Sequence, residues 1–135
     1  MLYVTGMYAL NVPCSLETCG DWHQLSMDWE HVLLKESDDT IWKDYGIERN
    51  KKIPYNEGLF NVANHIRACL DLIADGKFFL VQGMKEDYIC NDSYNEEIFS
   101  KVMMLKDASN WNEVDKFMEK EYMLAWLTYK KSKGL

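Results

Sequence analysis

The sequence has little of what membrane insertion, secretion or nucleic-acid binding requires. No stretch of the 135 residues approaches the ~20 apolar residues of a membrane span. Residues 1–10 lack the basic start and long apolar run of a secretory leader, so we expect a cytoplasmic protein without a membrane partner. Only two arginines occur, Arg49 and Arg67, and the net charge is −7. This balance disfavours direct nucleic-acid binding and suits docking onto a basic protein.

The short motifs of several large enzyme classes are also missing. There is no GxxxxGK[ST], GxGxxG, HExxH or GxSxG. No cofactor and no metal is therefore expected, and the remaining candidates are non-catalytic proteins and enzymes without a short motif.

Large side chains are plentiful by contrast. Hydrophobic residues make up 47% of the chain, with five Trp, eight Tyr and five Phe. A chain of this size has enough apolar mass to close one core, so we expect a single domain over residues 1–135 that needs no disulfide or metal. In a cytoplasmic protein the four cysteines are expected to be reduced.

The apolar pattern divides the chain into a loop-rich strand half, about 1–55, and a helical half, about 56–133. Leu2–Leu10 is rich in β-branched and aromatic residues and predicts a strand with a bulge at Gly6. Partial alternation over 27–34 predicts a second strand. Residues 36–55 are polar and predict a long surface connection.

Helical spacing dominates the second half. An apolar stripe predicts a helix from Asn56 to about Asp75, ended by Gly76, with a short strand at 78–82 after it. Ser93 opens a second helix and Asn110 a third, which runs to the lysines near the end of the chain. The fold class predicted is α+β: a small N-terminal antiparallel sheet packed against about three C-terminal helices.

The densest group of chemically active residues is Cys14, Cys19, Asp21 and His23. A thiol near an imidazole predicts a cysteine nucleophile, which needs a base to form its thiolate. Cys14, Cys19 and His23 together with His31 offer four ligands for zinc, but their spacing matches no common zinc framework. The alternative is a turn in which Gly20 has an unusual φ and Trp22 plugs the core.

Two other features admit a functional and a structural interpretation. His65 and Arg67 lie on the helix predicted for 56–75, where they line either a pocket or a solvated face with one partly buried His. Trp42 is flanked by Asp38, Asp39 and Asp44. This segment is either an exposed aromatic framed by acids that docks a basic protein, or an edge of the core that Trp42 covers.

Four segments carry a resemblance: Tyr3–His23, Val62–Ile73, Val81–Asp92 and Phe117–Leu127. They resemble short uncharacterised bacterial proteins of small mobile operons, of the toxin–antitoxin kind. The resemblance implies an accessory or neutralising role, and it brings no functional residue with it.

Three functional hypotheses follow. The first is a non-catalytic module that binds and neutralises a protein partner, as an antitoxin does, with contacts at Asp38, Asp39, Trp42 and Asp44. The second is a small cysteine/histidine-dependent enzyme. The third is a mobile-element inhibitor of a host defence nuclease, similar to anti-CRISPR proteins, whose acidic surface would cover a basic groove.

Overall fold

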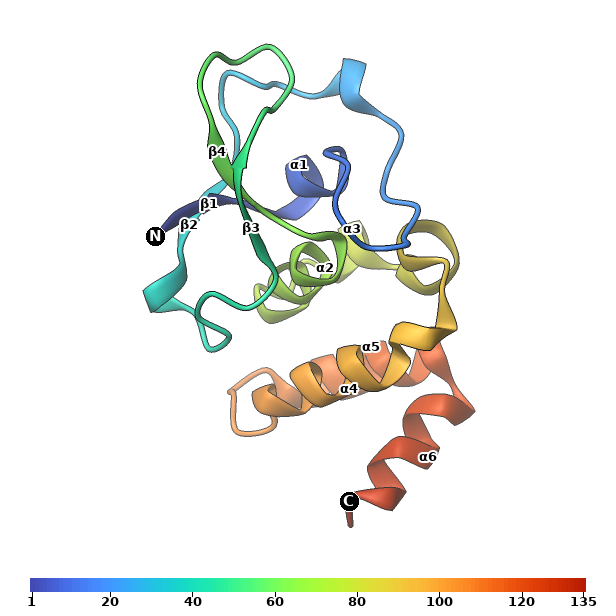
Figure 1. Ribbon diagram of the computed structural model, residues 1–135. Helices are drawn as coiled ribbons and strands as arrows, with labels where there is room; N and C mark the ends of the chain where they lie inside the picture. The colour runs from blue at the N-terminus through green and yellow to red at the C-terminus, as the bar shows by residue number, and fades with distance from the viewer.

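The structure is a computed structural model that describes residues 1–135. Its first layer is a four-stranded sheet (Figure 1). Its strands are β1 (Leu2–Val4), β2 (Leu34–Glu36), β3 (Ile47–Lys51) and β4 (Phe60–Ala63), in the order β2-β1-β4-β3. The outer pairs are antiparallel, as predicted, but the central pair β1–β4 is parallel. The sheet is therefore mixed, because the connection from β1 to β4 crosses over instead of forming a hairpin.

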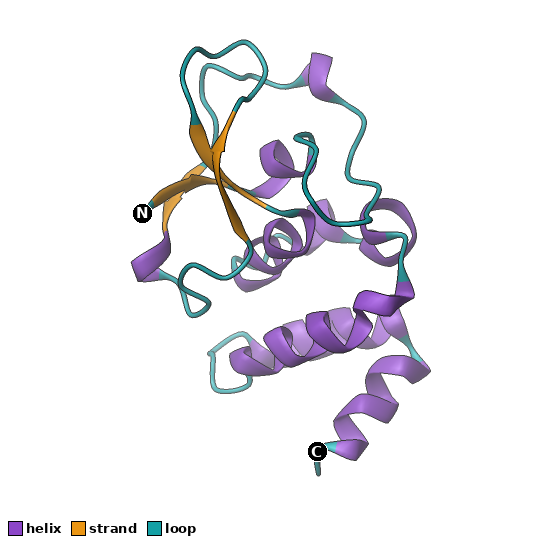
Figure 2. Cartoon of the chain, viewed as in Figure 1, coloured by secondary structure: helices purple, strands orange, loops and turns teal.

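Helices pack on one side of this sheet, and the predicted α+β class is confirmed. They are α1 (Gly6–Leu10), α2 (His65–Ala74), α3 (Phe78–Val81), α4 (Asn95–Val102), α5 (Trp111–Tyr122) and α6 (Leu124–Ser132). Short helical turns occur at Gln24–Ser26, Ser37–Asp39, Lys85–Ile89, Asp92–Tyr94 and Met103–Leu105. In Figures 1 and 2, α2 lies between the sheet and the layer of α4 and α5. None of the helices has the length and apolarity needed to cross a membrane.

Several predicted elements differ in the structure. The strand expected over Leu2–Leu10 ends at Val4, and Gly6, at φ +65°, begins α1 where a bulge was predicted. Residues 27–33 are not a strand, and the predicted strand at 78–82 is instead the short helix α3. The predicted connection 36–55 contains β3, whose sequence is mostly polar because it is an edge strand.

Helix α2 begins nine residues later than predicted, because Phe60–Ala63 forms β4. The Asn64 side chain accepts a hydrogen bond from the Arg67 N–H at 2.8 Å, so Asn64 is the N-cap in place of Asn56. The predicted end is right, since Gly76 follows the helix at φ +72°.

The third predicted helix is two helices. Met123, at φ +50° and ψ −123°, interrupts the run between α5 and α6. The apolar spacing continues across Met123, and no glycine or proline marks the break. The sequence pattern therefore predicts one continuous helix here.

One cluster of 28 buried hydrophobic residues runs through both halves, from Tyr3 to Trp126. Within it lies a polar network on α2, where Arg67 is fully buried and its Nε lies 3.0 Å from an Asp71 carboxylate oxygen. Asp71 also accepts hydrogen bonds from Tyr3 and Thr5, at 2.7 and 2.6 Å. The expectation of a solvated face at His65 and Arg67 is therefore wrong, since both are buried and satisfied by partners.

Candidate active site around Cys14 and His65

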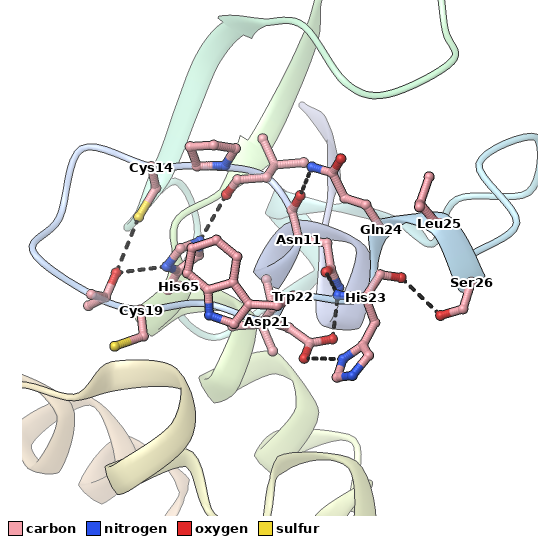
Figure 3. A pocket seen from close by; sticks show the side chains of 14 residues that line it. Asn11, Cys14, Cys19, Asp21, Trp22, His23, Gln24, Leu25, Ser26 and His65 are labelled. Carbon is pink, nitrogen blue, oxygen red and sulfur yellow. Dashed lines mark hydrogen bonds and ion pairs between the residues drawn. The ribbon is translucent and has the colours of Figure 1, made fainter.

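A cavity of about 600 Å³ opens beside the C-terminal end of α1 (Figure 3). Residues 10–14, 18–19 and 21–26 form most of its wall, and His65, the first residue of α2, closes its inner side. The volume is within the range of small-molecule sites in proteins.

The parallel pairing of β1 and β4 brings these segments together. Because α1 follows β1 and α2 follows β4, the two helices pack against each other, and the chain that leaves α1 meets the start of α2. His65 Nε2 lies 2.8 Å from the Val12 carbonyl oxygen and holds that chain in place.

A glycine is required at position 20, where the chain passes close to the His65 ring. Its φ is +70°, and a Cβ there would stand 2.6 Å from His65 Cε1 and 2.7 Å from the Leu10 carbonyl oxygen. The predicted unusual φ of Gly20 is thus confirmed, and the reason is close approach to the His65 ring as well as a turn.

A hydrogen-bonded chain joins the Cys14 thiol to His65 through Thr18. The Cys14 Sγ lies 3.6 Å from Thr18 Oγ1, and Thr18 Oγ1 lies 2.7 Å from His65 Nδ1. The Val12 carbonyl only accepts, so His65 Nε2 carries a hydrogen and Nδ1 is free to accept from the Thr18 hydroxyl. A proton that leaves Cys14 can therefore reach Nδ1 through Thr18.

The environment favours the thiolate. Burial raises the pKa of Cys14. The opposing effects are larger and lower the pKa to about 7: hydrogen bonding to the His65 side chain, hydrogen bonds from the backbone N–H groups of His65 and Leu16, and the charge of His65. Burial lowers the pKa of His65, but the thiolate of Cys14 and the Val12 carbonyl have the larger effect, so the pKa is raised overall. A thiol at a helix N-terminus beside a cationic histidine is a common setting for a reactive cysteine.

A second imidazole lies on the other side of the cavity. His23 Nδ1 is 2.7 Å from Asp21 Oδ1, and Asn11 Nδ2 is 3.0 Å from the other oxygen of Asp21. Burial raises the pKa of Asp21, but hydrogen bonds from Asn11 and His23 outweigh it and lower the pKa overall. Asp21 and His23 therefore form a pair with each other, and Figure 3 shows His23 pointing away from Cys14.

The outer edge of the cavity carries two unusually exposed apolar side chains. Trp22 is 81% exposed and Leu25 is 88% exposed. The prediction that Trp22 plugs the core is wrong, because the turn at Gly20 directs this residue outward to the cavity (Figure 3).

The structure gathers all four predicted residues around one cavity and corrects their roles. Cys19 is joined to Cys90 in a disulfide, so the expectation that all the thiols are reduced does not hold, and Cys19 is not a free nucleophile. Cys14 remains free, and its partner is His65 in place of His23. Sequence reasoning missed this pair because 51 positions separate the two residues and only the β1–β4 pairing brings them together.

The ligands considered for zinc do not converge. The only group of three or more metal-ligating side chains whose ligand atoms lie within 4.8 Å of one another is Asp28, Glu30 and His31, all exposed. His31 is hydrogen-bonded to Asp28 there, at 2.7 Å, so its ring has a protein partner already.

The predicted partner-binding segment is exposed only in its acidic part. Asp38, Asp39 and Asp44 are at the surface, whereas Trp42 is only 5% exposed and its Nε1 donates to the Lys101 carbonyl at 3.0 Å. Trp42 therefore covers an edge of the core, which is the structural alternative for this residue, and it is not an exposed anchor.

Comparisons with protein-family models, with curated proteins and with solved structures find no match to this chain. The resemblance to proteins of toxin–antitoxin-like operons thus stays a prediction, and the residues of the cavity carry the functional argument.

Proposed function

We propose that the protein is a small cysteine-dependent enzyme in which Cys14 attacks an electrophilic carbonyl group. One observation carries the proposal: a free thiol, linked through Thr18 to His65, lines a cavity large enough for a small substrate. A nucleophile, a base that holds its proton and a place for the substrate are the parts that covalent catalysis requires.

The reaction is acyl transfer in two steps. The Cys14 sulfur bonds to the carbonyl carbon, the bond from that carbon to the leaving group breaks, and the proton held by His65 returns through Thr18 to the leaving group. Water then attacks the acyl carbon and gives one proton through Thr18 to His65, the carbon–sulfur bond breaks, the carboxylic acid departs, and the thiolate reforms beside the protonated His65. Because the pKa of Cys14 is about 7, a large share of the thiol is ionised at neutral pH before substrate binds.

Acylation by p-nitrophenyl acetate tests this proposal. We expect a burst of nitrophenolate equal to one per chain, and an acetyl group that mass spectrometry locates on Cys14. The Cys14→Ala variant should lose the burst, while Cys69→Ala should keep it, because Cys69 is free but fully buried in the core, where burial raises the pKa of its thiol. A burst that persists in Cys14→Ala, or no burst in the unaltered protein, would overturn the proposal.

A second candidate function is the binding of a basic protein partner, antitoxin-like. It is supported by the net charge of −7 and by Asp38, Asp39 and Asp44, which are exposed on one short segment. Co-expression with the products of neighbouring genes, followed by a pull-down, tests it. Capture should be lost when all three residues are changed to lysine and kept when Asp107 and Glu113, exposed elsewhere, are changed instead.

The same assay separates an antitoxin-like role from inhibition of a defence nuclease. A nuclease inhibitor covers a nucleic-acid groove, so added DNA or RNA should displace the protein from its partner. Capture that nucleic acid does not weaken favours the antitoxin-like alternative.

A further inference from the structure

The cavity beside Cys14 has no unengaged cation that would hold an anionic substrate. None of its fourteen lining residues is Lys or Arg. Its one carboxylate, Asp21, is already paired with His23 and Asn11. A helix N-terminus commonly binds anions, but the N-terminus of α2 is already occupied, because the backbone N–H of His65 stabilises the Cys14 thiolate. Recognition of a phosphate or carboxylate would need donors that are not engaged elsewhere.

The apolar part of the wall points to the ligand's character. Leu10 and Val12 are buried and line the inner side, Pro13 is exposed, and Trp22 and Leu25 stand at the edge with 81% and 88% of their surface exposed. Figure 3 shows the Trp22 indole across the middle of the view, in front of His65. An indole left in water beside a cavity gains contact area and stacking energy when a planar group covers it.

We infer, on the basis of the proposed function, that the substrate is an uncharged acyl compound with an aromatic or other planar apolar group close to its reactive carbonyl. The carbonyl would lie at Cys14, and the planar group would stack on Trp22. Nucleotides, phosphorylated metabolites and small carboxylic acids are outside this class, because no Lys or Arg lines the cavity and its two histidines are already paired, His65 with Thr18 and the Val12 carbonyl and His23 with Asp21.

Alkylation of Cys14 by three related reagents tests the inference. Iodoacetamide is small and neutral, iodoacetate is anionic, and N-benzyl-iodoacetamide carries a neutral aromatic group. In each reaction the thiolate sulfur forms a bond to carbon, the carbon–iodine bond breaks and iodide leaves. Rates are read from the Cys14 peptide by mass spectrometry and divided by the rate of each reagent with N-acetylcysteinamide, which removes the reagents' intrinsic differences.

We expect the benzyl reagent to be about tenfold faster than iodoacetamide after this correction, and iodoacetate to be the slowest. Trp22→Ala should abolish the benzyl advantage, which is read as the ratio of the two corrected rates within that variant. Phe79→Ala is the matched control, since Phe79 is an aromatic that is 69% exposed outside the cavity, and it should keep the advantage.

The possible failures are distinguishable. If Cys14 reacts with iodoacetamide no faster than N-acetylcysteinamide does, the thiol is not activated, and the proposed function falls together with the inference. If Cys14 is activated but shows no benzyl preference, or keeps that preference in Trp22→Ala, or reacts fastest with iodoacetate, only the substrate class is overturned.

Discussion

Replacing His65 by glutamine should change the reactivity of Cys14 in opposite directions at low and high pH. A glutamine amide can still donate to the Val12 carbonyl and accept from Thr18, so the wall of the cavity keeps its contacts. The hydrogen bond from the imidazolium and its charge, which lower the pKa of Cys14, are lost, while burial, which raises the pKa, and the backbone N–H groups of residues 65 and 16, which lower it, remain. Because these remaining effects oppose each other, the variant thiol should titrate near 9.0, its ordinary value.

The magnitude follows from two opposing effects. At pH 7 a thiol of pKa about 7 is about half ionised and one of pKa 9.0 is about 1% ionised, a ratio of about fifty. The intrinsic nucleophilicity of a thiolate rises with its pKa at a Brønsted slope of about 0.45, which favours the variant about eightfold over two units. The unaltered protein should thus react about sixfold faster at pH 7, and the variant about sevenfold faster at pH 10.

Iodoacetamide labelling from pH 5 to 10, scored on the Cys14 peptide, measures both arms of this prediction. The two curves should cross slightly above pH 8, and His31→Gln, which alters an exposed histidine outside the cavity, should follow the unaltered protein. Parallel curves that never cross, or a midpoint near 9 in both proteins, would show that His65 does not set the pKa of Cys14.

The remaining predictions concern stability, measured as the free energy of unfolding in urea. Asp71→Ala should cost about 3–5 kcal/mol, because it leaves the buried Arg67 charge without its partner. Changing Cys19 and Cys90 together to serine should cost about 4 kcal/mol, since their disulfide closes a loop with a sequence separation of 71 residues; an equal stability under a dithiol reductant and without it would argue against the bond. Met123→Gly should stabilise the protein by about 1 kcal/mol, because the residue is 68% exposed and its φ of +50° suits glycine; a loss of stability would contradict this reasoning.

The parts of the fold that are encoded locally could be predicted, and the parts that depend on pairing between distant segments could not. The stop at Gly76 and the turn at Gly20 each depend on one residue and its neighbours. The run from Leu59 to Ala63 fits both a helical stripe and a strand, and only its position between β1 and β3 makes it a strand. The polar edge strand β3 has no apolar pattern to reveal it.

The candidate site divides in the same way. Its local half, the segment from Cys14 to His23, stands out in the sequence as the densest group of polar and sulfur-bearing side chains, and it does line the cavity. Its distant half, His65, gives no such signal, because an isolated histidine at a helix start is compatible with many environments. Cys90, the partner of Cys19, is likewise 71 positions away, and spacing alone does not pair it.

The buried network on α2 connects the fold to this site. Asp71 receives hydrogen bonds from Tyr3 and Thr5, which fix the rotation of α2 against β1, and Arg67 ties the same helix to the carbonyl groups of residues 43 and 45. A well-packed apolar core would be at least as stable as such a network, so stability alone does not account for it. What the network does fix is where the first turn of α2 lies. His65 on that turn is then held against the Val12 carbonyl and Thr18, through which it is linked to the Cys14 thiol.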